Sequence, residues 1–311
     1  MARLEGKNAT VLAVIDASTE FLKKHQIESP KTNAQQLLAM VLEMDRTSLY
    51  MNFEQVLSEA ELTEARALVK RRAEGVPLQH LLGTVQFLDW TFKTDGRALI
   101  PRHETELLVD NLRRRWQTQV TEPPEEQADG VEPKPGQVSW PCPKSLLDVG
   151  TGSGVIALAL ALSFPEMQVF ACDKSEEALA LAQENATKLG GKDRVQWLVS
   201  DLFAALPADL SFDAVVANLP YIPRGEIAEL SREVKADPHL ALDGGDDGLE
   251  LIRHCIADAP GRLNPGGLLM LEIGFDQATQ VMDLLNSANF HDIQVDLDYE
   301  QRERFVSGRY G

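Results

Sequence analysis

The stretch Ser145-Leu146-Leu147-Asp148-Val149-Gly150-Thr151-Gly152-Ser153-Gly154 decides the fold of this chain. Its first half is an apolar run that predicts a buried parallel strand, and its glycines predict a tight turn. The residues that follow, Val155-Ile156-Ala157-Leu158-Ala159-Leu160, continue as an apolar helix. A strand, a Gly-rich turn and a helix in this order open a nucleotide-type site, because the glycines allow close approach and the first N–H groups of the helix favour an anionic group.

The turn differs from the fingerprint of dinucleotide-binding proteins. That fingerprint needs Gly or Ala at its sixth position, where this chain has Val155, so a nicotinamide dehydrogenase is disfavoured. The next predicted strand, 168–173, ends in Asp173. An acidic residue at this place can bind both hydroxyls of a ribose.

A further predicted strand, 212–217, is followed directly by Asn218-Leu219-Pro220-Tyr221. Ligands of open α/β sheets bind at the carboxyl ends of the strands. The Asn218 side-chain oxygen and the Leu219 backbone carbonyl can both accept hydrogen bonds from one planar NH2 group, while the Tyr221 ring packs against its face. The alternative is an ordinary Asx-Pro turn. Asp148, the Gly-rich turn and Asp173 together favour a binding site.

Asp148-x-Gly-x-Gly-x-Gly, Asp173 and Asn-x-Pro-Tyr resemble S-adenosylmethionine-dependent methyltransferases of the amino class. Further segments are similar to one family, the glutamine-N5 methyltransferases of peptide chain release factors. These segments are 77–83, 99–106, 241–249 and 272–277. The most specific is Ile100-Pro101-Arg102-His103-Glu104-Thr105-Glu106, because other amino methyltransferases lack the motif Ile-Pro-Arg-x-Glu-Thr-Glu.

The resemblance implies transfer of a methyl group from S-adenosylmethionine to N5 of the glutamine in the Gly-Gly-Gln motif of release factors. The expected catalytic residues are Asn218, Leu219, Pro220 and Tyr221. The expected cofactor-binding residues are Asp148, Gly150, Thr151, Gly152, Ser153, Gly154, Asp173, Asp201, Leu202 and Asn218. Asp201 would accept from the exocyclic amine of adenine, or else act as a simple helix cap. Arg102 and Glu104 are expected to line the substrate site, or else to form an ordinary surface pair.

One departure from the family pattern concerns Leu219. The family usually has Asn-Pro-Pro-Tyr, and the resemblance implies that the second residue acts through its backbone carbonyl, which leucine keeps. Leucine lacks the fixed φ of proline, so the turn is less rigid before substrate arrives. We expect a modest effect on affinity or rate.

Alternating apolar strands and helices predict an α/β fold, a doubly wound sheet with helices on both faces. The resemblance implies a Rossmann-like methyltransferase sheet of seven strands with the last one antiparallel. Strands are expected near 145–149, 168–173, 195–199, 212–217, 267–273, 293–297 and 304–308. Helices are expected near 104–116, 153–163, 175–189, 247–263 and 276–288.

The expected domains are a helical substrate-docking domain (1–83), a β-hairpin linker (84–96) and the methyltransferase domain (97–311). The helical domain could instead serve dimerisation or stability. Ser58-Glu59-Ala60-Glu61 predicts a capping box at a helix start. The acidic, Pro-rich segment 117–143 interrupts the resemblance and is expected to be a disordered or extended insertion.

The composition and net charge of the chain narrow the classes of molecule that it is expected to bind. The net charge of −18 over 311 residues disfavours nucleic-acid binding, which usually needs a basic face. This weakens the main alternative, an adenine-N6 methyltransferase of DNA or RNA. A third reading, a binding protein without turnover, has only Leu219 in its favour. We expect no metal, since three cysteines and six histidines show no ligand spacing, and a cytoplasmic enzyme without a membrane segment. The oligomeric state is left open.

Overall fold

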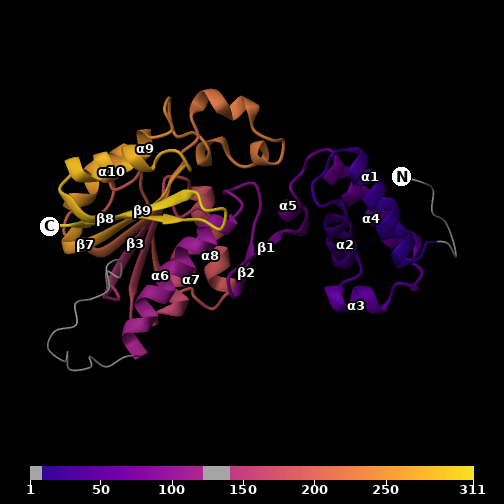
Figure 1. Ribbon diagram of the computed structural model, residues 1–311. Helices are drawn as coiled ribbons and strands as arrows, with labels where there is room; N and C mark the ends of the chain where they lie inside the picture. The colour runs from indigo at the N-terminus through magenta and orange to yellow at the C-terminus, as the bar shows by residue number, and fades with distance from the viewer. Residues whose placement is uncertain (1–8, 122–140) are drawn as a thin grey trace, which may run out of the picture. The chain divides into compact units, whose positions relative to one another are not determined.

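The computed structural model describes residues 9–121 and 141–311, which divide into two compact units (Figure 1). The smaller unit contains the chain up to Val85 together with Leu230–Ala236. The larger unit contains Gln86–Glu229 and Asp237–Gly311. The segment Leu230–Ala236 therefore clusters with helices that precede it by more than a hundred residues.

The smaller unit is helical. Its helices are α1 (Val11–Lys24), α2 (Pro30–Val41), α3 (Arg46–Met51), α4 (Glu59–Ala73) and α5 (Leu78–Leu82). The predicted capping box is confirmed, since Ser58 Oγ accepts from the Glu61 N–H and the Glu61 carboxylate accepts from the Ser58 N–H. The buried Arg72 donates to Asn33 Oδ1 at 2.6 Å and forms an ion pair with Glu233, which ties Leu230–Ala236 to this unit.

A two-stranded hairpin, β1 (Thr84–Phe87) and β2 (Trp90–Lys93), follows the helices as predicted. Phe87 and Phe92 are fully buried and pack edge to face, with ring centroids 5.8 Å apart. Helix α6 (His103–Thr121) comes next and is longer than the predicted 104–116. Residues 117–121, which were expected to begin the disordered or extended insertion 117–143, are therefore helical, and residues 122–140 of that insertion lie outside the described residues.

The larger unit contains a seven-stranded sheet, as expected. Its strands are β3 (Ser145–Val149), β4 (Gln168–Asp173), β5 (Val195–Val199), β6 (Phe212–Asn218), β7 (Leu263–Glu272), β8 (Phe290–Leu297) and β9 (Glu303–Tyr310). Their order is β5-β4-β3-β6-β7-β9-β8. Strands β3 to β7 are parallel, whereas β9 runs antiparallel to β7 and β8, so the last strand is antiparallel as the resemblance implied.

Helices cover both faces of the sheet (Figure 1). Helices α6, α7 (Val155–Ser163) and α8 (Glu176–Lys188) form one layer, and α9 (Glu250–Asp258) and α10 (Ala278–Ser287) form the other. Helix α9 is shorter than the predicted 247–263. Gly248 has a left-handed φ of 74°, which a helix cannot include, and Pro260 lies in the 3-10 turn Ala259–Gly261 that follows.

The strand order reverses at β3, which lies between β4 and β6. The carboxyl ends of these strands therefore define the switch point at which doubly wound sheets bind ligands. Within the described residues, every helix is too short or too polar to span a membrane. The His, Cys, Asp and Glu side chains of the same residues do not form a group that could hold a metal ion.

Candidate functional site

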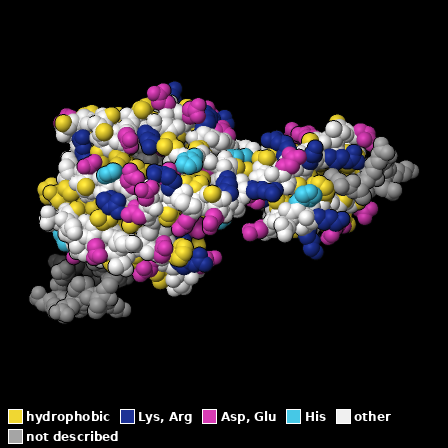
Figure 2. Space-filling view, turned by 90° about the horizontal axis from the view of Figure 1, so that it is seen from above, with side chains coloured by type: hydrophobic (Ala, Val, Ile, Leu, Met, Phe, Trp, Pro, Cys, Tyr) yellow, Lys and Arg dark blue, Asp and Glu magenta, His cyan; other side chains and the backbone are white. Residues whose placement is uncertain are grey.

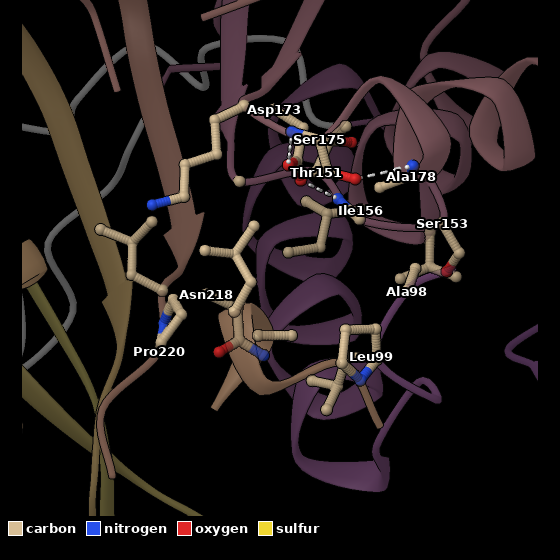
Figure 3. A pocket seen from close by; sticks show the side chains of 18 of the residues that line it. Ala98, Leu99, Thr151, Ser153, Ile156, Asp173, Ser175, Ala178, Asn218 and Pro220 are labelled. Carbon is tan, nitrogen blue, oxygen red and sulfur yellow. Dashed lines mark hydrogen bonds between the residues drawn. The ribbon is translucent and has the colours of Figure 1, made fainter. Parts of the chain in front are cut away.

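A pocket lies at the switch point, over the carboxyl ends of β3, β4 and β6 (Figure 3). Asn218 and Pro220 lie on one side of it, Ala98 and Leu99 on another, and Asp173 and Ser175 at the end away from Asn218. Its lining includes these predicted site residues: Gly150, Thr151, Gly152, Ser153, Asp173, Asp201, Leu202, Asn218, Leu219 and Pro220. The structure thus brings together segments that are widely separated in the sequence.

Asp148 does not line the pocket but lies fully buried behind the Gly-rich turn. Its Oδ2 accepts from Thr151 Oγ1 at 2.6 Å and from the Ala157 N–H at 3.1 Å, which holds the turn against the start of α7. Its Oδ1 is buried with no hydrogen-bond partner among the described residues. Burial, with Asp173 nearby, raises the pKa of Asp148 to about 7. In this arrangement Asp148 shapes the turn.

Asp173, the last residue of β4, is half-buried at the pocket wall. Its Oδ2 accepts from the Gly152 N–H and its Oδ1 from the Ser175 N–H, each at 2.9 Å. A carboxylate oxygen has two acceptor positions, so both oxygens keep one for a ligand. This carboxylate could therefore accept hydrogen bonds from the two hydroxyl groups of a ribose.

Asp201 and Leu202 both line the pocket after β5. Residues 201–206 form a turn and not a helix, so Asp201 is not a helix cap, and the Ala205 N–H of this turn donates to Ser200 Oγ at 3.0 Å. Leu202 has a left-handed φ of 47°, which costs on the order of 1 kcal/mol for a residue with a Cβ. Strain of this kind at a pocket wall is typical of residues that shape a ligand site.

The tetrapeptide Asn218-Leu219-Pro220-Tyr221 leaves β6 at the pocket. Leu219 is only 4% exposed and packs against the Gly-rich turn, where a Cβ on Gly150 would lie 3.0 Å from Leu219 Cδ2. Tyr221 does not line the pocket, and its ring packs against the core. Burial and the nearby Glu272 carboxylate raise the pKa of Tyr221 to about 12, so its hydroxyl stays protonated.

Two glycines bring the segment 241–249 against this tetrapeptide. A Cβ on Gly244 would lie 2.8 Å from the Pro220 carbonyl oxygen, and one on Gly248 would lie 2.4 Å from the Tyr221 carbonyl oxygen. The Tyr221 carbonyl also accepts from Gln277 Nε2 at 3.0 Å. Both segments that carried the resemblance near the C-terminus therefore hold the tetrapeptide in place.

Sequence reasoning assigned no role to Thr105 and Glu272, which the structure joins to Asn218. Asn218 Nδ2 donates to Thr105 Oγ1 at 2.9 Å, and Thr105 Oγ1 donates to Glu272 Oε2 at 2.8 Å. Thr105 lies within the segment 99–106, and Glu272 lies within the segment 272–277. Both segments carry the family resemblance, which could have pointed to these residues, but a sequence does not show which side chains contact one another.

Arg102 and Glu104 do not line the pocket. Arg102 forms an ion pair with the buried Asp237 at 2.6 Å, and Asp237 also accepts from the Ile100 N–H at 3.1 Å. These contacts tie 100–102 to Asp237, which directly precedes the pocket-lining residues Pro238, Leu240 and Ala241. The charge of Glu104 acts on Tyr221 and Glu272, raising the pKa of both.

Comparison with known proteins agrees with this geometry. Residues 13–83 match the family model "PrmC N-terminal domain", and residues 146–236 match "Methyltransferase domain". A release factor glutamine methyltransferase of Geobacter sulfurreducens is 38% identical over 303 residues, covering 97% of each chain. The corresponding protein of Moorella thermoacetica is 39% identical over 280 residues, covering 89% of this chain and 90% of its own. The chain belongs to the release factor glutamine methyltransferase family.

As a member of this family, the chain is a methyltransferase with S-adenosylmethionine as its cofactor. The residues present fit this cofactor, because Asp173 keeps acceptors for a ribose and apolar side chains such as Leu202 can cover a flat base. The solved catalytic domain of hMettl16 in complex with a MAT2A 3′UTR hairpin shares the fold. It has a TM-score of 0.50 at 12% identity and covers 82% of each chain.

Replacing Asp173 by alanine should weaken S-adenosylmethionine binding by about 1–3 kcal/mol, the scale of losing hydrogen bonds to a charged group. Calorimetric titration of the purified variant measures this, with thermal unfolding to check the fold. Asp283→Ala, an exposed change on α10, is the control. Parental affinity in folded Asp173→Ala would exclude the ribose role.

Proposed function

We propose that this enzyme transfers the methyl group of S-adenosylmethionine to N5 of the glutamine in the Gly-Gly-Gln motif of peptide chain release factors. The observation that carries the proposal is the orientation of Asn218 at the pocket. Its Nδ2 is engaged by Thr105, so Oδ1 is left as an acceptor beside the residues that fit the cofactor. An acceptor there suits a substrate that presents an NH2 group.

The chemistry follows from the weakness of an amide nucleophile. The amide nitrogen shares its lone pair with the carbonyl, so positive charge that develops on nitrogen must be stabilised. Asn218 Oδ1 and the Leu219 carbonyl accept from the two N–H bonds, which stabilises that charge and fixes the nitrogen in orientation. Bound S-adenosylmethionine supplies an electrophilic methyl group on a sulfonium. The alkylated amide is acidic and releases its proton to water.

The substrate class rests on the family, whose members are named for release factors. The net charge of −18 would favour approach to a basic protein surface. Acidic and basic side chains are interspersed over the face of the larger unit seen in Figure 2, unlike the continuous basic stripe typical of nucleic-acid binding. A release factor substrate would place the activity in the cytoplasm, and the helical unit would serve as its docking domain.

The test is methyl transfer to four acceptors: a release factor, the same factor with its target glutamine changed to asparagine, a free Gly-Gly-Gln peptide and double-stranded DNA. Mass spectrometry of the products should locate one methyl group on the glutamine side-chain nitrogen of the intact factor. The asparagine factor and DNA should stay unmodified. Methylation of DNA adenine, or equal methylation of the asparagine factor, would refute the proposal.

Leu219→Pro should hold or raise kcat toward release factor. Proline at position 219 would fix the φ angle of that residue and so make the turn before Pro220 more rigid. The backbone carbonyl at 219 would remain an acceptor. The measurement is kcat and KM for the parent and the variant at saturating cofactor, with Leu219→Ala as the comparison that removes the side chain without fixing φ. A Leu219→Pro enzyme slower than Leu219→Ala would show that the leucine packing matters more than turn rigidity.

A further inference from the structure

The hydrogen bonds among Glu272, Thr105 and Asn218 have a defined polarity. An ionised carboxylate can only accept, so the Thr105 hydroxyl must direct its proton to Glu272 Oε2. Because its one proton is used in this way, the Thr105 hydroxyl can only accept a hydrogen bond from Asn218. Asn218 must therefore turn its NH2 group to Thr105, as the 2.9 Å contact with Nδ2 shows, and its Oδ1 must point the other way.

We propose that Thr105 and Glu272 are positioning residues that fix the side-chain amide of Asn218 with Oδ1 toward the substrate nitrogen. The inference rests on the proposed function, because it concerns the acceptor that Asn218 would provide. Neither residue needs to touch the reacting atoms. Without them, the amide of Asn218 could rotate and present a donor where the substrate requires an acceptor.

The placement of the three residues supports this role. Asn218 and Glu272 are register partners at the carboxyl ends of the parallel strands β6 and β7, and Thr105 lies in the first turn of α6. Thr105 is 3% exposed and Glu272 is 1% exposed, with Glu272 Oε1 unpaired among the described residues. Burying a carboxylate with one unpaired oxygen is costly. A contact with a purely structural role would not require a carboxylate at this position. An ionised carboxylate is required to make Thr105 donate to Glu272 and accept from Asn218.

The ionisation of Glu272 sets the polarity. Burial raises the pKa of Glu272 to about 7, and the negative charge of Glu104 also raises it. The hydrogen bonds from Thr105 and Asn218 and the positive charge of Arg304 act in the opposite direction and lower it. Tyr221 also interacts electrostatically with this carboxyl group, and burial with the Glu272 charge raises the pKa of Tyr221 to about 12, so its hydroxyl stays protonated. A protonated Glu272 could donate to Thr105, which would then donate to Asn218 and turn its amide. The rate should therefore rise with pH through the pKa of Glu272.

The test compares Thr105→Val, Thr105→Ser and Glu272→Gln in methyl transfer to release factor. Thr105→Val keeps the shape but removes the hydroxyl, and should lower kcat by roughly 10- to 100-fold with little change in KM or cofactor affinity. Thr105→Ser should restore most of that loss. Glu272→Gln can donate or accept, so it should lower kcat and flatten the rise with pH. Glu303→Gln, exposed on β9, is the matched control.

A double-mutant comparison separates positioning from a general structural role. If Thr105 acts through Asn218, adding Thr105→Val to Asn218→Ala should change kcat by less than about 2-fold. A full additional loss in that background, or parental kcat in folded Thr105→Val, would overturn the positioning role. Parental kcat in folded Asn218→Ala would likewise overturn it, because Asn218 would then not be the acceptor to be positioned. Absence of methyl transfer by the parent enzyme would instead refute the proposed function.

Discussion

Asn218→Ala is expected to lower kcat for release factor by a factor on the order of 10² to 10³, by analogy with removing one donor from an oxyanion hole. The change removes one of two acceptors that stabilise charge on the substrate nitrogen, and it leaves the Gly-rich turn intact. Cofactor affinity should change much less, although Asn218 lines the same pocket. Steady-state kinetics and calorimetry together separate the two effects.

The control for this variant is Asn286→Ala, an exposed change on α10 that should leave kcat at the parental value. Unfolding temperatures of both variants check that each is folded. An Asn218→Ala enzyme that methylates release factor at the parental rate would exclude the tetrapeptide as the group that presents the amide.

Gly248→Ala is expected to lower kcat by roughly 100-fold, because it displaces the tetrapeptide from the pocket edge. The new Cβ would lie 2.4 Å from the Tyr221 carbonyl oxygen, so backbone must move. The left-handed φ of 74° adds strain on the order of 1 kcal/mol. The measurements are kcat and the free energy of unfolding.

Gly190→Ala is the matched control, since Gly190 has a φ of 73° and a Cβ there would meet no atom within 4 Å. It shares the backbone strain of Gly248→Ala but lacks the contact with Tyr221. Gly190→Ala should therefore lose some stability and keep its kcat. Equal kcat in the two variants would show that the close approach to Tyr221 has no part in catalysis.

Local signals in the sequence predicted most strands of the larger unit and the start of one helix of the smaller unit. Short apolar runs located β3 to β6 within one residue, and the runs of β3, β4 and β6 are almost continuously apolar because these strands are buried on both faces. Ser58 and Glu61 predicted the start of α4, because a capping box is a contact between residues three apart. Strand β7 was predicted too short at its start, since Asn264, Pro265 and Gly266 resemble a turn.

Long-range contacts could not be predicted in the same way. Thr105 and Glu272 are 167 residues apart, and Arg72 and Glu233 are 161 apart. No periodicity links residues at such separations, and only the packing of α6 and of the strand ends brings the first pair together. The sequence therefore predicted that Asn218 lies at the pocket, but not that Thr105 and Glu272 are joined to it by hydrogen bonds.

A crystal structure with S-adenosylhomocysteine and a release factor would show whether the tetrapeptide presents the substrate amide. We expect the glutamine side-chain nitrogen within about 2.7–3.2 Å of both Asn218 Oδ1 and the Leu219 carbonyl oxygen. We also expect Asn218 Nδ2 to remain hydrogen-bonded to Thr105. A glutamine nitrogen held by other groups, or one facing Asn218 Nδ2, would exclude the tetrapeptide from this role.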